Sequence, residues 1–123
     1  MPKRVLDVGN CSLDHGSIRR LVEESFDAEV VRARRADDAL RALRHGPFGL
    51  VLVNRQFART AALGLDLIRQ IKADPQLAAI PVMLLSNYAD AQQEAVAAGA
   101  EPGFGKADLD DEETRQRLAR FLA

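Results

Sequence analysis

Short apolar runs alternate along this chain with longer segments in which apolar residues recur every three or four positions. The short runs predict β-strands over residues 5–8, 29–33, 50–53, 81–85 and, more weakly, 102–105. The longer segments predict α-helices over residues 14–26, 37–44, 64–73, 89–98 and 110–122. Because strand and helix alternate, the pattern predicts one α/β domain over residues 1–123. Its architecture would be a doubly wound five-stranded parallel sheet with helices on both faces.

The apolar runs differ in a way that predicts where each strand lies in the sheet. Residues 50–53 read Leu-Val-Leu-Val, which is typical of a central strand covered on both faces. The second run contains Arg32 and therefore predicts an edge strand with one face toward water. Asp7 lies within the first run, where both faces should be apolar. A buried carboxylate is costly without a partner, so we expect Asp7 to be paired or neutralised.

Composition narrows the class of protein. The chain carries 17 Lys and Arg against 18 Asp and Glu, a net charge of −1 that favours neither nucleic acid nor anionic membrane as a partner. Its single cysteine, Cys11, cannot form an internal disulfide, fits a reducing compartment and is expected to be buried and inert. No apolar run is long enough for a signal peptide or a membrane span, so we expect a cytoplasmic protein. Whether the chain is free-standing or the first module of a longer protein is left open.

The predicted fold also indicates where function should lie. In doubly wound parallel sheets the functional crevice is at the carboxyl ends of the strands, near the switch in strand order. The residues that follow the predicted strands are therefore the candidates: Gly9, Asn10, Asn54, Ser86, Asn87 and those around Lys106.

Several motifs occur in a familiar order along the chain. They are residues 49–54 (GLVLVN), 64–72 (GLDLIRQIK) and 80–86 (IPVMLLS), with Gly99-Ala100 and Lys106 after them. In this order and spacing the chain resembles a response-regulator receiver domain, the CheY-like family of two-component signalling, over almost its entire length. The resemblance implies a flavodoxin-like fold and a site where a carboxylate accepts a phosphoryl group from a phospho-histidine donor with the help of Mg²⁺.

The resemblance also assigns roles to five positions. The family has an acidic pair after the first strand, an acceptor aspartate after the third, Ser or Thr after the fourth and Lys after the fifth. Here these positions hold Gly9 and Asn10, Asn54, Ser86 and Lys106. The first three depart from the pattern and the last two agree with it.

The departures change the expected chemistry. Mg²⁺ usually needs one or two carboxylates, whereas glycine offers no side-chain ligand and an asparagine carbonyl is neutral. An amide nitrogen is also a poor nucleophile, and carboxylates are the residues that form aspartyl-phosphates. We therefore expect a degenerate pseudo-receiver that binds no metal or cofactor and is not an enzyme. Its phosphorelay signalling would depend on protein contacts and not on phosphorylation.

The region after the predicted fifth strand departs from the family in the same direction. Ala107 follows Lys106 where the family usually has proline, so the peptide between them should be trans. Gly103 stands where the family often places a switching Tyr or Phe. Phe104 is expected to fill core space instead of reporting phosphorylation.

The titratable side chains near the site carry one specific hypothesis. We expect Asp7 to act as a compensating carboxylate paired with Lys106 or Arg55, the alternative being an edge position reached by water. His15 and His45 are expected to be surface residues near helix ends, with no spacing for a metal site.

The resemblance implies a partner such as a histidine kinase or an output domain, with a monomer or weak homodimer and no direct nucleic-acid or membrane binding. In the family, partners usually meet the face formed by the fourth helix, fifth strand and fifth helix. Here that face would include Gln92, Gln93, Ala95, Ala107 and Asp108.

Other interpretations stay open at this point. One is a phosphoacceptor of atypical chemistry that uses Asp7 or Asp14, and another is a small-ligand sensor that uses the flavodoxin-like crevice. Phe57 and Tyr88 are expected to flank this crevice as candidate anchors for a partner. Several arginines around the predicted second strand and helix form a basic face. We expect this face to be solvated, and the next interpretation is that it docks an acidic partner. The arginines are Arg32, Arg34, Arg35, Arg41 and Arg44.

Overall fold

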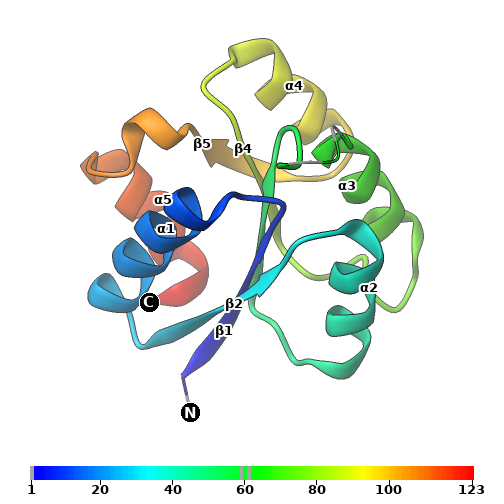
Figure 1. Cartoon of the computed structure of the whole chain (residues 1–123), viewed down its shortest axis with the longest axis horizontal. Helices are drawn as coiled ribbons and strands as arrows, with labels where there is room; N and C mark the ends of the chain where they lie inside the picture. The colour runs from blue at the N-terminus through cyan, green and yellow to red at the C-terminus, as the bar shows by residue number, and fades with distance from the viewer. Residues whose placement is uncertain (1, 59, 61) are drawn as a thin grey trace.

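The computed structural model describes residues 2–58, 60 and 62–123 of the chain. These residues form a single parallel sheet in the order β2-β1-β3-β4-β5 (Figure 1). The direction of winding reverses between β1 and β3, which confirms the predicted doubly wound sheet. The strands are β1 (Lys3–Val8), β2 (Ala28–Ala33), β3 (Leu50–Asn54), β4 (Val82–Leu85) and β5 (Glu101–Phe104).

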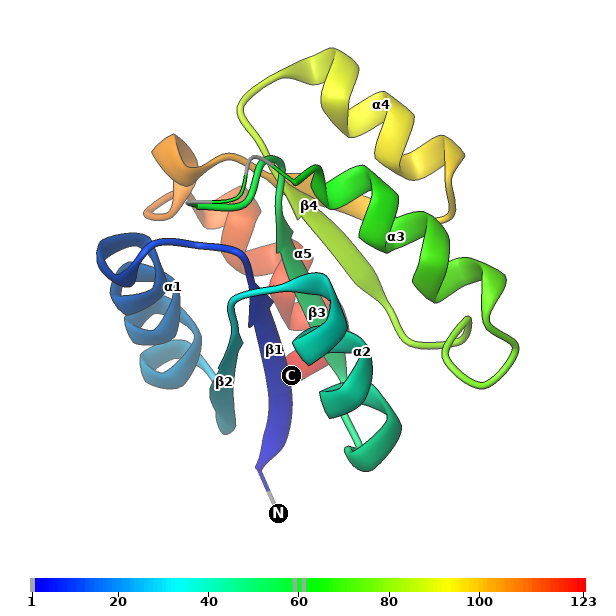
Figure 2. The same cartoon turned by 45° about the vertical axis from the view of Figure 1, so that its right-hand side comes forward.

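Helices cover both faces of this sheet, as the alternating pattern predicts (Figure 1, Figure 2). One face carries α1 (Ser12–Ser25) and α5 (Glu112–Leu122). The other carries α2 (Ala36–His45), α3 (Gly64–Ala73) and α4 (Ala89–Ala97). Within the described residues, no helix has both the length and the apolar character that a bilayer crossing demands.

The apolar strand β3 lies at the centre, where sequence predicts it. Each of its five residues is buried, because Leu50 and Leu52 pack toward α1 and α5 while Val51 and Val53 pack toward the opposite layer. Strand β2, which contains Arg32, lies at an edge of the sheet, as predicted.

Element boundaries differ from the prediction where local hydrogen bonds decide them. Helix α1 begins at Ser12, two positions before the predicted start. Helix α5 begins at Glu112 because Lys106–Asp108 form a short 3-10 turn, η1, whose Asp108 carbonyl accepts a hydrogen bond from Thr114 Oγ1 at 2.7 Å. Strand β4 begins at Val82, since the preceding proline has no N–H to donate to a neighbouring strand.

Candidate functional site

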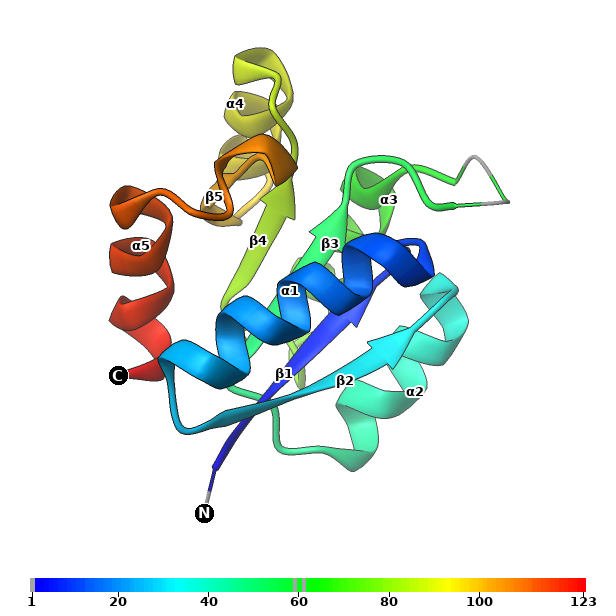
Figure 3. The same ribbon diagram turned by 60° about the vertical axis from the view of Figure 1, so that its left-hand side comes forward.

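The loops after β1, β3, β4 and β5 meet at the carboxyl edge of the sheet (Figure 3). Asn54, Ser86 and Lys106 line one hollow there, with a volume of about 300 Å³. Gly9 and Asn10 line a different hollow, of about 170 Å³. The structure thus brings the five predicted positions to one edge of the sheet but divides them between two hollows.

Gly9 has no room for a side chain. Its backbone is left-handed, with φ of +81°, a conformation that favours glycine. A Cβ atom at this position would lie 2.3 Å from Cδ1 of Phe57, far inside van der Waals contact. Phe57 is 3% exposed, so the expectation that it flanks an open crevice is wrong. Its ring instead occupies the space beside Gly9 that an acidic side chain would need.

Asn54 at the end of β3 is a hydrogen-bond donor. Its side-chain Nδ2 donates to the carbonyl oxygen of Gly9 at 3.1 Å and to that of Gln56 at 2.7 Å. Both partners are acceptors, so the amide nitrogen and not the amide oxygen must face them. These two bonds tie the end of β1 to the loop after β3. A carboxylate in the same orientation would place its oxygen against two carbonyl oxygens.

Ser86 and Asn87 use their side chains on nearby backbone. Ser86 Oγ accepts a hydrogen bond from the Tyr88 N–H at 3.1 Å, which shapes the turn into α4. Asn87 Oδ1 accepts from the Ala107 N–H at 3.3 Å and so joins the loops after β4 and β5. Both side chains therefore organise the edge of the hollow.

Lys106 reaches across the site to helix α1. Its Nζ lies 2.9 Å from Oδ2 of Asp14, which forms an ion pair between η1 and the first turn of the helix. The hydrogen bond from Lys106 lowers the pKa of the Asp14 carboxyl below its ordinary value, although partial burial opposes the shift. The Lys106–Ala107 peptide is trans, as the missing proline predicts.

Asp7 has partners other than those expected. It is fully buried, at 0% exposed. Its Oδ1 accepts a hydrogen bond from Asn10 Nδ2 at 2.5 Å, and its Oδ2 lies 2.7 Å from Nδ1 of His15. The prediction that Asp7 pairs with Lys106 or Arg55 is therefore wrong, as is the alternative of a water-accessible edge position.

The sheet register explains this partnership. Asp7 lies opposite Leu52 in β3, on the sheet face that α1 covers. His15 is in the first turn of α1 and is partly buried over that face, so the prediction that it is a surface residue is wrong. A signal was present in the sequence, because His15, Ile18 and Val22 recur at helical spacing and the last two face the core.

Gln92 on α4 is a structural residue that the sequence analysis did not single out as one. Its Nε2 donates to the carbonyls of Leu84 at 2.8 Å and Ser86 at 3.1 Å, and its Oε1 accepts from the Gly103 N–H at 3.0 Å. A Cβ on Gly103 would lie 2.1 Å from the Leu84 carbonyl oxygen. The position where receivers often carry a switching aromatic is therefore packed tightly against β4.

The donor set at this edge does not fit the Mg²⁺ site that the resemblance implies. Gly9 has no side chain, and Asn10 and Asn54 supply neutral amides. Among the described residues Asp7 is the buried carboxylate at this edge, and it already has a partner on each oxygen. A hard dication prefers carboxylate oxygens, and the part of the chain that the structure describes contains no group of three His, Cys, Asp or Glu side chains placed to share a metal.

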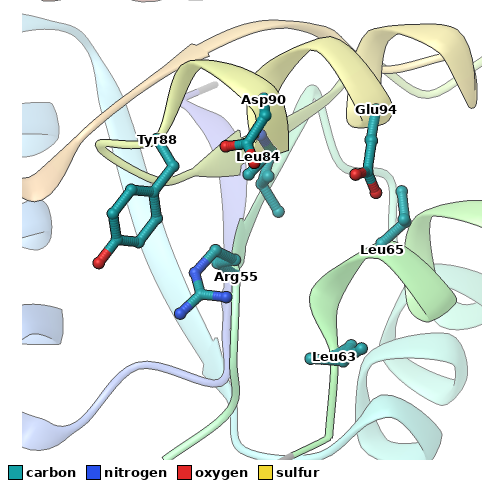
Figure 4. Close-up of a pocket in the computed structure, with 8 residues that line it drawn as sticks. Arg55, Leu63, Leu65, Leu84, Tyr88, Asp90 and Glu94 are labelled. Carbon is teal, nitrogen blue, oxygen red and sulfur yellow. The ribbon is translucent and has the colours of Figure 1, made fainter.

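A further hollow of about 470 Å³ opens between the loop after β3 and helix α4. Figure 4 shows Arg55 and Tyr88 at one side of it and the carboxylates of Asp90 and Glu94 coming from α4. The guanidinium of Arg55 lies over the Tyr88 ring, 5.1 Å from its centroid. Apolar side chains complete the lining: Leu63, Leu65, Leu84 and Ala91.

Two other expectations about exposure need correction. Cys11 is exposed at the start of α1 and not buried. Ala95 is 0% exposed, so it belongs to the core beneath α4 and not to the predicted partner face. Phe104 is 3% exposed and fills core space as predicted.

Solved structures of response regulators share this fold. The chain is similar to a response regulator from Thermotoga maritima, with a TM-score of 0.79, 23% identity and 98% of each chain covered. It is similar to the chemotaxis protein CheY4 of Vibrio cholerae, with a TM-score of 0.78, 18% identity, and 99% of this chain and 100% of the other covered.

A third similar structure is the signal receiver domain of a DNA-binding response regulator from Colwellia psychrerythraea, with a TM-score of 0.76 and 24% identity over 96% of this chain and 98% of the other. No protein-family model matches the chain. At these identities the likeness establishes the fold, so the chain has the CheY-like receiver fold that its motifs predicted.

Proposed function

We propose that this receiver-fold chain is a two-component signalling module that acts through protein contacts without accepting a phosphoryl group. The proposal includes a histidine kinase or an output domain as the partner and the cytoplasm as the place of action. A reducing compartment fits the lone, exposed Cys11.

The observation that carries the proposal is the role of Asn54. At the position where the resemblance expects the acceptor aspartate, the side chain donates two hydrogen bonds to backbone carbonyls. The chemistry of an amide supports a structural role, because its nitrogen is not a nucleophile. Phe57 packs so closely against Gly9 that no side chain fits there, which supports the absence of a metal ligand at this position of the family's acidic pair.

The surface formed by α4, β5 and α5 supports a protein partner. It contains a groove of about 570 Å³ whose lining includes Val96, Pro102 and Arg117. Val96 is 44% exposed, which is high for an aliphatic side chain within a groove. Gln93 of the predicted partner face is exposed on α4, and Ala107 and Asp108 are exposed on the η1 turn between β5 and α5. We propose this groove as the contact surface for the kinase or output domain.

The absence of phosphoryl transfer can be tested directly. The protein is incubated with acetyl phosphate and Mg²⁺, and its intact mass is measured beside that of a receiver domain that retains its acceptor aspartate. We expect the control to gain one phosphoryl group and this chain to gain none. A mass gain that disappears in Asp14→Asn would instead establish an atypical phosphoacceptor and overturn the proposal.

The partner surface needs a separate experiment. Val96→Glu places a charge in the groove, while Leu13→Glu makes the same change at a 79% exposed position on α1. Binding to candidate kinase and output domains is measured by biolayer interferometry with and without acetyl phosphate. We expect the groove variant alone to lose binding and the phosphodonor to have no effect. Equal binding by both variants would reject this surface.

The hollow beside Arg55 and Tyr88 favours a second candidate function, a sensor of small ligands. Its volume of about 470 Å³ lies in the range of ligand pockets, and it combines apolar walls with charged groups. Thermal-shift screening against nucleotides, flavins and amino acids tests this candidate, since a ligand at about 100 times its Kd adds about 2.7 kcal/mol of stability.

A further inference from the structure

The hollow beside Gly9 and Asn10 has chemistry of its own. It lies between the loop that leads into α1 and the end of β2, and its volume is about 170 Å³. None of its lining residues belongs to the hollow around Asn54, Ser86 and Lys106. The lining consists of Gly9, Asn10, Cys11, Ser12, Arg32, Arg34 and Ala58.

Two arginines give this hollow a strong positive charge. Arg32 uses one Nη to donate to Ser12 Oγ at 3.2 Å and the other to donate to the Asn10 carbonyl at 2.9 Å. Both acceptors are neutral, and Arg34 is exposed. Within residues 2–58, 60 and 62–123, neither arginine forms an ion pair with a carboxylate.

Helix α1 points its N-terminus at the same place. Its first residue, Ser12, lines the hollow, and the preceding Cys11 makes no side-chain capping bond. The first backbone N–H groups of a helix have no partner within the helix and carry the positive end of its dipole. Asp14 lies in this first turn, but Lys106 neutralises its carboxylate at 2.9 Å.

Polar atoms without partners provide a second, independent indication of a ligand. Among the described residues, Arg32 Nε and Asn10 Oδ1 are buried and have no hydrogen-bond partner. Asn10 itself is 2% exposed and lines the hollow. A buried polar atom left unsatisfied costs about 1–3 kcal/mol, so the fold holds one spare donor and one spare acceptor here.

A phosphate group matches this set of partners. Its anionic oxygens suit the two guanidinium groups and the helix N–H groups. Because the second pKa of a phosphate monoester is about 6, part of it retains a P–OH near neutral pH, which can donate to the Asn10 acceptor. Sulfate has no such proton. The volume of about 170 Å³ is enough for one such group.

We propose that this hollow, here called the Arg32–Arg34 site, binds a small ligand bearing a phosphate monoester without any covalent step. No carboxylate is among the described residues that line it, and the two nearest along the chain have partners of their own: Asp7 is hydrogen-bonded to Asn10 and His15, and Asp14 is paired with Lys106. The proposal goes beyond the function proposed above, because it concerns other residues and requires neither a kinase nor a partner protein.

Phosphate itself is the probe for the first test. The ¹⁵N-labelled protein is titrated with sodium phosphate at constant ionic strength, with sodium sulfate and sodium chloride as parallel series. We expect saturable shifts of the Ser12, Leu13 and Asp14 amide signals with phosphate, weaker binding with sulfate and no saturation with chloride. Shifts that do not saturate, or sulfate binding as tight as phosphate binding, would overturn the proposal.

A pair of variants separates the site from general charge. Arg34→Gln removes a guanidinium that lines the hollow, whereas Arg35→Gln removes its exposed neighbour, which does not line it. Both changes lower the net charge equally and leave the core untouched. We expect phosphate affinity to fall about tenfold in Arg34→Gln, which corresponds to about 1.4 kcal/mol, and to stay unchanged in Arg35→Gln. An equal loss in both variants would show that only the overall charge matters and would reject the site.

Discussion

At the end of β3, the side chain of Asn54 acts as a hydrogen-bond donor, a role that no carboxylate at the same position can take. It joins the Gly9 carbonyl in β1's loop to the Gln56 carbonyl in its own loop. The residue is 8% exposed, so water cannot easily replace either bond. The side-chain nitrogen of Asn54, which an aspartate would lack, therefore stabilises the edge of the sheet where the resemblance implies phosphoryl transfer.

Asn54→Asp should destabilise the protein. The change removes both donated hydrogen bonds and places a carboxylate oxygen against two carbonyls, so we expect the free energy of unfolding to fall by about 1–3 kcal/mol. Urea denaturation at neutral pH measures the effect. Asn87→Asp is the matched control, because its Oδ1 is an acceptor that aspartate preserves. If Asn54→Asp lost no more unfolding free energy than Asn87→Asp, the donor role of Asn54 would be contradicted.

The sequence predicts where a site residue lies when its position after a strand is enough to place it. It does not predict which side chain that residue contacts. Residues that follow a parallel strand reach the carboxyl edge whatever their side chains, so Asn54, Ser86 and Lys106 were predictable. The partner of Asp7 was not, because it depends on which helix covers that face of β1.

At the scale of elements, α4 is held to the sheet by Gln92. The helix buries few side chains, with Ala95 as its one buried residue among those described. The amide of Gln92 adds three hydrogen bonds to the backbone of β4, β5 and the loop between β4 and α4. The proposed partner groove lies along the same helix, so the position of that groove depends on this connection.

Gln92→Glu tests the connection. A glutamate keeps an acceptor for the Gly103 N–H but cannot donate to the Leu84 and Ser86 carbonyls. We expect a loss of about 1–3 kcal/mol in unfolding free energy and faster hydrogen exchange in α4. The exposed neighbour Gln93→Glu makes the same charge change without these bonds and should alter neither quantity. Similar exchange in both variants would contradict the assignment.

Elements themselves were largely predictable, and their ends were not. Helix α3 begins and ends where the pattern places it, over Gly64–Ala73. Helix α1 begins two residues earlier than predicted and helix α5 two residues later. For α5 the reason is the Lys106–Asp108 turn and its side-chain bond to Thr114, which reshape the loop before the helix. Such turns rest on contacts that hydrophobic spacing does not encode.

Across the whole molecule, the pair of Lys106 and Asp14 links segments 92 residues apart. Because the hydrogen bond from Lys106 lowers the folded-state pKa of the Asp14 carboxyl, ionised Asp14 favours the folded state. This stabilisation is fully present at pH values above the pKa that the Asp14 carboxyl has in the unfolded chain. It is lost as the pH falls through the lower folded-state pKa.

Lys106→Met should therefore lower Tm at neutral pH and cease to matter in strong acid. The effect should be modest, since both side chains are partly exposed and water screens the pair. Thermal melts of the wild type, Lys106→Met, Asp14→Asn and the double variant from neutral to acidic pH measure the coupling. A Tm difference between wild type and Lys106→Met that persists undiminished below the folded-state pKa of Asp14 would disprove the linkage.

By itself, the order of apolar runs and amphipathic segments determined the alternation of strands and helices along the chain and the central place of β3. It also determined the edge of the sheet at which the candidate residues gather. It could do so because burial on two faces and the right-handed crossover leave few arrangements open. Tertiary structure alone decided that Phe57 packs on Gly9, that His15 meets Asp7, and that Arg32 and Arg34 converge on the N-terminus of α1. These outcomes depend on distances between residues from separate elements, which become defined when the helices pack against the sheet.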